Sequence, residues 1–226
     1  MPTIIDLTLP FGEDTVGPPS VGAGVKLTSH HRGPGFWQAS GIEMLLHTGS
    51  HVDFSRHCHP DGETAADVAL DRACGQALVI DATEVGENQP IPLDLVKLRG
   101  AGLASGEIAL IRTDWSDRMW GSFPDYYLRS PYCPPETARW LVDRGVKAVG
   151  FDCFSEYAAR LVDFGSEDFV VHKTVLEAGA ILMQQLTGLS QLPTEEKFLF
   201  FAPSLKVRGG EGAPARFFAI IESNNK

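Results

Sequence analysis

The 226-residue sequence lacks the usual signals for export, membrane spanning and disulfide bonding. It opens MPTIIDLTLPFGED, without a basic start or an apolar core, so we expect no signal peptide. No apolar run approaches the ~20 residues needed to cross a bilayer. The four cysteines at positions 58, 74, 133 and 153 form no CxxC pair. We therefore expect reduced thiols in a cytoplasmic protein.

Several catalytic signatures are also missing. The sequence has no GxSxG elbow, no HExxH pair and no dinucleotide fingerprint. The turn RGGEGAP lacks the lysine and hydroxyl residue of a phosphate loop. A net charge of −10 argues against nucleic acid or an anionic membrane as a partner. A small-molecule substrate is the partner that we expect.

The pattern of apolar runs predicts one α/β domain over residues 1–226 with a strand-rich mixed sheet. Glycine and proline positions suggest where two of the helices begin or end. The predicted strands cover residues 4–7, 36–46, 77–85, 107–115, 146–153, 198–205 and 216–222, and the predicted helices 93–98, 134–145 and 172–176. Periodicity leaves the run 180–183 open between helix and strand. The Pro/Gly-rich stretch 10–24 is predicted to be a loop that could lie over a site.

The segment HTGSHVDFSRH, residues 47–57, is the strongest chemical signal. His47, His51 and Asp53 fall within seven residues and carry donors that bind zinc and neighbouring divalent metals. Gly49 gives the chain freedom to curl so that the three converge. A metal held on one side only leaves an open position for water, whose pKa falls toward ~7. His57 is then free to shuttle a proton.

The segment 47–57 resembles the HxGTHxDxPxH signature of the cyclase family, which includes bacterial kynurenine formamidase and isatin hydrolase. Companion segments in the same order also match. They are IIDLTLPF, HPDGETAADVALDRACGQALVIDAT, ALIRTDWSDRMW, CPPETARWLVDRGVKAVGFDCFSEY, HKTVLEAGAILMQQL and KFLFFAPSLKVRGGEGAPARFFAI. The resemblance implies a swivelling β/β/α fold and a homo-oligomer, a dimer or tetramer. It implies His47, His51 and Asp53 as metal ligands and His57 as catalytic acid/base. His172 matches the later family histidine, a second-metal ligand in the two-zinc members, and we predict that here it is a catalytic residue that orients the carbonyl or the metal-bound water.

The sequence departs from the family pattern at three places. Ser50 replaces threonine and keeps the hydroxyl, whereas Phe54 and Ser55 replace a small residue and proline. Gln184 stands where the two-zinc members have a glutamate, twelve residues after the histidine. Because two neighbouring dications repel and an amide brings no charge, we expect one zinc or manganese ion per chain, with Gln184 as a possible oxygen ligand.

The loop 10–24 also lacks the tryptophan that formamidases place near an aryl substrate. We therefore expect other rings, those of Phe36, Trp37 and Phe54, to contact the substrate. The predicted activity is hydrolysis of an amide or lactone bond in a small cyclic or aromatic substrate, such as an isatin-like cyclic amide or an N-formyl arylamine. The alternatives are a non-catalytic metal- or ligand-binding member of the fold and a lactone hydrolase or cyclase-dehydratase.

Each assignment has a plainer structural alternative. His172 could simply begin a helix, and Gln184 could be a hydrogen-bonded core amide. We interpret Cys58 and His59 as structural and the histidines at positions 30 and 31 as solvated. The carboxylates at positions 152 and 156 could line the pocket, but strand-end and loop acids are more often structural.

Overall fold

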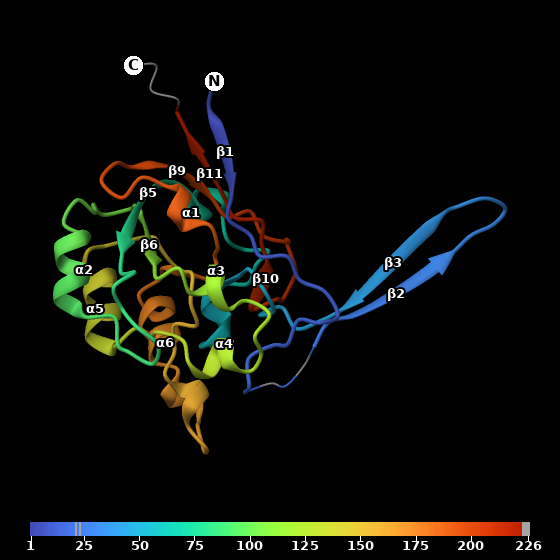
Figure 1. Cartoon of the computed structure of the whole chain (residues 1–226), viewed down its shortest axis with the longest axis horizontal. Coiled ribbons are helices and arrows are strands. Elements are labelled where there is room, and N and C mark those ends of the chain that lie inside the picture. The colour runs from blue at the N-terminus through green and yellow to red at the C-terminus, as the bar shows by residue number, and fades with distance from the viewer. Residues whose placement is uncertain (21, 23, 223–226) are drawn as a thin grey trace.

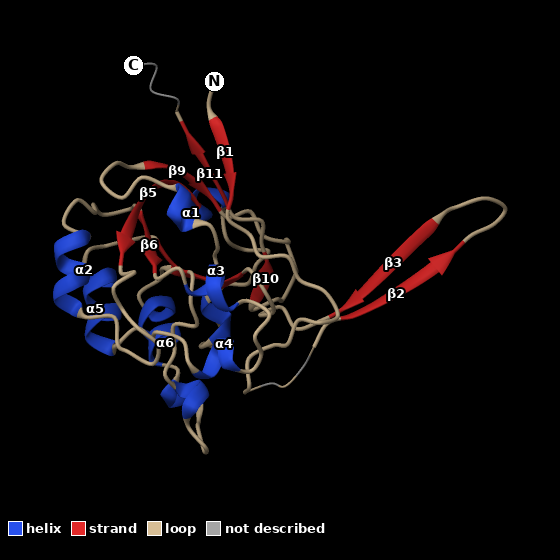
Figure 2. Ribbon diagram, viewed as in Figure 1, coloured by secondary structure: helices blue, strands red, loops and turns tan. Residues whose placement is uncertain are grey.

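The computed structural model describes residues 1–20, 22 and 24–222. Positions 21, 23 and 223–226 of the predicted domain lie outside the described residues. The described chain forms one nine-stranded sheet and a separate two-stranded hairpin (Figures 1 and 2). The mixed α/β class predicted from the sequence is confirmed.

The large sheet has a parallel centre and antiparallel flanks. Its spatial order is β1 (Thr3–Asp6), β11 (Phe218–Ile221), β9 (Phe198–Phe201), β5 (Cys74–Asp81), β6 (Ile108–Arg112), β7 (Ala148–Phe151), β8 (Ile181–Gln184), β4 (His51–Asp53) and β10 (Gly212–Pro214). Strands β5 to β8 are parallel neighbours, and the remaining pairs are antiparallel. The short strand β4, which carries most of the metal motif, therefore lies between β8 and β10.

Three helices connect the parallel strands and cover one face of the sheet. They are α2 (Leu93–Arg99), α5 (Pro135–Asp143) and α6 (Val170–Glu177). Proline at the first position begins α5, as the sequence predicts. The shorter helices are α1 (Leu70–Ala73), α3 (Trp115–Met119) and α4 (Asp125–Leu128), with 3-10 turns η1 (Ser55–His57), η2 (Ala158–Arg160), η3 (Ser166–Asp168) and η4 (Leu189–Gln191).

Both faces of the central strands are buried. Along β5, Leu78 and Ile80 belong to the cluster that packs against the helices, whereas Ala77 and Val79 belong to a second cluster. That second cluster draws Val52 from β4 and other apolar residues from β9, β10 and β11. The sheet is thus curled, so that its outer strands help to bury its own second face. Continuous apolar runs such as ALVI are typical of strands buried on both sides.

The predicted strand over residues 36–46 shows the largest difference from the structure. Only Gln38–Glu43 forms a strand, β3, and it pairs with β2 (Lys26–His31) in the hairpin, which we call the arm. The arm projects from the body, and every strand residue in it except Gly41 is exposed (Figure 1). The histidines at 30 and 31, predicted to be solvated, are exposed residues of β2. Periodicity did not resolve the run 180–183, which forms most of β8.

No described helix meets the length and apolarity needed to cross a bilayer.

Candidate metal centre and pocket

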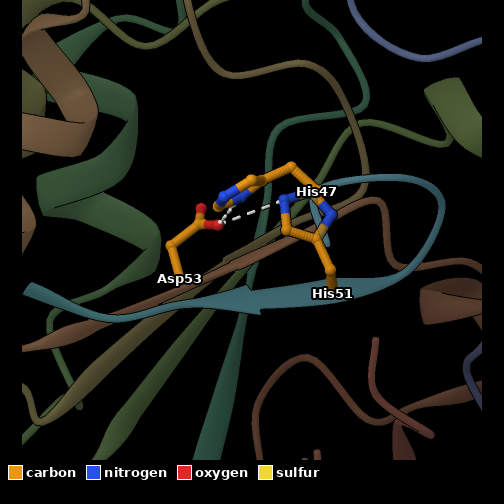
Figure 3. Close-up of side chains that lie close together, drawn as sticks. All are labelled: His47, His51 and Asp53. Carbon is orange, nitrogen blue, oxygen red and sulfur yellow. Dashed lines mark hydrogen bonds and ion pairs between the residues drawn. The ribbon is translucent and has the colours of Figure 1, made fainter. Parts of the chain in front are cut away.

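A turn followed by a short strand brings the metal motif together. Gly49 has a φ of 67° in the turn that precedes β4, a conformation that favours glycine. Side chains alternate along a strand, so His51 and Asp53 share one face of β4 while Val52 points into the apolar core. His47, on the other side of the turn, folds back over that face (Figure 3).

The three predicted ligands converge in the structure. Asp53 Oδ1 lies 2.6 Å from His47 Nδ1 and 3.2 Å from His51 Nε2. One donor atom from each residue lies within 4.8 Å of the others, and Figure 3 shows the Asp53 carboxylate facing both imidazoles. Burial opposes ionisation of Asp53, but the surrounding histidines hold the pKa of its carboxyl well below the usual range. The carboxylate is therefore ionised and available as a ligand.

His172 is a fourth titratable residue beside the three predicted metal ligands. It lies in the first turn of α6, with Nε2 3.4 Å from Asp53 Oδ2 and Nδ1 2.7 Å from Glu156 Oε1. Burial disfavours the charged ring, but the neighbouring carboxylates of Asp53 and Glu156 outweigh it and raise the pKa of His172 to about 10. The sequence favoured a structural role for Glu156. In the structure, Glu156 also orients a predicted catalytic histidine.

His57 lies beside this cluster rather than in it. Its ring, at the end of η1, stacks on His47 with centroids 4.1 Å apart and lies 5.5 Å from the His172 ring. Burial and the neighbouring imidazoles lower the pKa of His57 to about 4, against the pull of Asp53. The ring is therefore neutral near pH 7, the state from which a general base starts, although a pKa this low makes it a weak base in the metal-free protein.

Gln184 faces the same site from the neighbouring strand. It is the cross-strand partner of His51, and its Nε2 donates a 2.8 Å hydrogen bond to Ser155 Oγ. Its Oε1 and the Oδ2 of Asp53 are buried oxygens without a hydrogen-bond donor among the described residues. Buried acceptors normally have a partner. Two such oxygens beside converging imidazole nitrogens match the oxygen and nitrogen ligands of a divalent cation, so the residues fit a metal.

A cavity of about 590 Å³ opens over this cluster. Apolar side chains that help to line it are Pro18, Leu45, Cys58, Phe154 and Phe169. Pro18 and Ser20 come from the stretch 10–24, which confirms that this loop lies over the site. Burial raises the pKa of the Cys58 thiol to about 11, so it remains protonated and is a weak metal ligand.

Phe36, Trp37 and Phe54, which we predict to contact the substrate, are not among the residues that line this cavity. Phe36 and Trp37 lie in the loop of the arm and are 87% and 65% exposed. Phe54 is 2% exposed because it shares the core-facing side of its strand with Val52. The rings that line the pocket are instead Phe154 and Phe169, which sequence spacing did not single out.

Ser50 explains why a hydroxyl suits this position of the motif. Its Oγ accepts a hydrogen bond from Leu9 N at 2.9 Å and donates one to Gln185 O at 2.7 Å. The hydroxyl thus fastens the N-terminal segment and the end of β8 to the metal turn. Serine provides the same two bonds as threonine would, which is consistent with a mild departure from the family pattern.

The buried carboxylate, the converging imidazoles and the cavity define a metal-binding enzyme site on a curled α/β sheet. Residues 5–156 match the family model described as "Putative cyclase". The chain is 31% identical to the kynurenine formamidase of Salinibacter ruber over 177 residues, covering 77% of this chain and 76% of that protein. The chain therefore belongs to this cyclase family.

Solved structures agree with this assignment. Isatin hydrolase A from Labrenzia aggregata, solved with benzyl benzoate, superposes with a TM-score of 0.81 at 25% identity and covers 97% of this chain and 94% of its own. A structure described as a potential metal-dependent hydrolase with cyclase activity gives 0.75 at 26% identity, covering 99% and 100%. The chain is accordingly a metal-dependent hydrolase.

Proposed function

We propose that this protein hydrolyses an amide bond in a small cyclic or aromatic substrate with the help of one divalent ion, zinc or manganese. The observation that supports this most strongly is the convergence of His47, His51 and Asp53 on a buried point beneath an apolar cavity. Gln184 Oε1 adds a neutral oxygen on the same side. A single carboxylate and a neutral amide favour one ion over two, because mutual repulsion of two dications would be poorly offset.

When bound, the ion polarises a carbonyl and makes hydroxide available near neutral pH. The residues of this chain provide the remaining steps. His57, neutral and facing the cavity, takes the proton released from the attacking water and returns it to the leaving nitrogen. His172, held by Glu156, orients the substrate carbonyl or the attacking water.

The pocket favours a flat apolar substrate. Phe154, Phe169 and Leu45 line it and provide surfaces for an aromatic ring. The relatives with known activity include kynurenine formamidases and isatin hydrolases. Together these support an isatin-like cyclic amide or an N-formyl arylamine as the substrate. A lactone offers a similar carbonyl to the same site and belongs in the same panel of test compounds.

We also propose that the chain acts as a homo-oligomer in the cytoplasm. The arm exposes the cross-strand pair Leu27 and Ile42 together with the rings of Phe36 and Trp37. It carries Lys26 and Arg32 against a single acid, Glu43, whereas the whole chain has a net charge of −10. This surface suits the acidic body of a second copy. All four cysteines are free thiols, in keeping with a reducing compartment.

Two substitutions separate metal binding from proton transfer. His51→Ala should reduce metal to well below one ion per chain and abolish turnover, because a ligand is lost. His57→Ala should keep the metal and lower kcat by roughly 10²- to 10⁴-fold, the usual contribution of an acid/base. Elemental analysis and a panel of formamides, cyclic imides and lactones provide the measurements. His30→Ala, a change in the exposed arm, is the control.

Retained turnover in His51→Ala would refute the proposal. Metal bound at one ion per chain without hydrolysis of any compound in the panel would favour the non-catalytic alternative. Products whose summed mass equals the substrate or the substrate minus one water would point to the cyclase-dehydratase alternative, since the products of hydrolysis together contain one added water.

A further inference from the structure

We propose that Glu211 is a positioning residue for the metal ligand His47. The inference rests on the proposed function, because it concerns how the ion is held. Glu211 lies in the turn that leads into β10, and its Oε1 is 3.2 Å from His47 Nε2. It stands 164 positions away from His47 in the chain, so spacing within the motif could not reveal it.

The two nitrogens of His47 have different neighbours. Nδ1 faces Asp53 and the point where the three ligands converge, and Nε2 faces Glu211. A ring that binds a cation through Nδ1 must carry its proton on Nε2. That N–H then donates to the Glu211 carboxylate. Glu211 thereby selects the tautomer that leaves Nδ1 free, fixes the rotation of the ring and makes the ring a stronger donor.

The backbone holds Glu211 in place. Phe54 N donates to Glu211 O at 2.9 Å, directly after the ligand Asp53, and Gly212 is in register with Asp53. Gly212 also leaves room for the ring, since a Cβ there would be 2.5 Å from His47 Cε1. The glutamate and the ring it contacts are therefore positioned by the same strand pair that carries the metal site.

The other two imidazoles at the centre follow the same rule. His51 Nδ1 lies 2.7 Å from the carbonyl oxygen of Gly49, and His172 Nδ1 lies 2.7 Å from Glu156 Oε1. Each ring has an acceptor on the nitrogen that faces away from Asp53. Glu211 is the member of this set whose carboxylate is partly open to solvent, with 40% of its side chain exposed. It can therefore be changed with little risk to the fold.

Metal affinity of the stripped protein is the decisive measurement. Titration of zinc and of manganese against a chelating dye gives Kd for each variant without any need for substrate. Glu211→Ala should raise Kd by roughly 10- to 100-fold, the usual effect of losing such a partner. Glu211→Gln keeps an acceptor oxygen and should recover most of the affinity. Glu177→Ala removes a carboxylate of similar exposure that instead lies near His59, and should change Kd less than twofold.

The outcomes are distinguishable. If the wild-type protein binds neither metal, the proposed function fails and not merely the role of Glu211. If the wild type binds metal and Glu211→Ala stays within twofold, or if Glu177→Ala weakens binding as much, the positioning role is refuted. Circular dichroism of each variant confirms that the fold is retained, and cobalt absorption would show an altered ligand geometry in Glu211→Ala alone.

Discussion

The metal site and the arm are built in opposite ways from neighbouring stretches of chain. The motif at 47–57 is fastened by bonds to segments far away in sequence, such as Ser50 to Leu9 and Gln185, and His47 to Glu211. The arm, at 26–43, pairs residue by residue with itself and leaves nearly all of its side chains in solvent.

The two regions therefore differ in how far each is stabilised by contacts within its own chain. A two-stranded hairpin is only marginally stable in water without further packing. Packing against another surface would therefore stabilise the arm, whereas the site is already positioned by its own chain. Changes at the site should act on metal binding and catalysis, and changes in the arm should act on association.

A glycine-to-alanine substitution in each region should give the largest difference between them in metal affinity and stability. In Gly212→Ala the new Cβ would lie 2.5 Å from His47 Cε1, so the ring must shift from its position beside Asp53. We expect metal Kd to rise at least 10-fold, and the free energy of unfolding to fall by about 1–3 kcal/mol from overpacking. Dye competition and chemical denaturation measure the two effects.

Gly33→Ala is the matched change in the arm, because a Cβ there meets nothing within 4 Å. It should leave metal Kd unchanged and alter the stability by less than about 0.5 kcal/mol, as is usual for open surface positions. Equal effects of the two substitutions on metal affinity would remove the distinction between the regions.

Sequence patterns predicted the central sheet well because its strands are apolar on both faces. Runs such as ALVI in β5 and IALIR in β6 allow few other structures. The three-residue strands β4 and β10 were missed, since neither carries a repeating pattern. The arm was misjudged for a different reason. Its apolar residues do not alternate with polar ones as they would on a half-buried strand. The sequence therefore predicted one strand running from Phe36 and Trp37 into the metal motif.

At the site, a local motif identified the ligands but not the groups that hold them. His47, His51 and Asp53 lie close in sequence, so their spacing alone indicated a metal. Glu211 and Phe169 reach the pocket, and Glu156 reaches His172, from other elements of the fold. Acidic residues in loops are common and mostly solvated, and only the folded chain shows which of them face an imidazole.

A second comparison is between the metal-free and metal-bound states as pH changes. With its pKa raised to about 10 by Asp53 and Glu156 against the effect of burial, His172 holds a proton that the unfolded chain releases near pH ~6.5. Its stabilising contribution is complete below about 6.5 and is lost as pH rises toward about 10. The metal-free protein should therefore lose stability over this range.

Metal should oppose that loss, because ligands bind it in their deprotonated form and a rise in pH favours binding. Thermal unfolding from pH 6.5 to 10, with and without zinc, measures both trends. In His172→Gln, which cannot titrate, the decline of the metal-free protein should be shallower. An identical slope in the variant would show that other groups control the alkaline loss.

The smallest effect on the site should come from the arm. Leu27 and Ile42 face each other across β2 and β3 and are both exposed, so changing both to serine removes apolar contact area without disturbing the pocket. We expect the wild type to sediment as a dimer or tetramer. In the double variant the dissociation constant of the oligomer should be at least 10-fold higher, as the loss of a hydrophobic contact of this size implies. Metal content should stay the same in both. A wild type that sediments as a monomer, or a variant that keeps its assembled size, would mean that the arm is not the surface through which two copies meet.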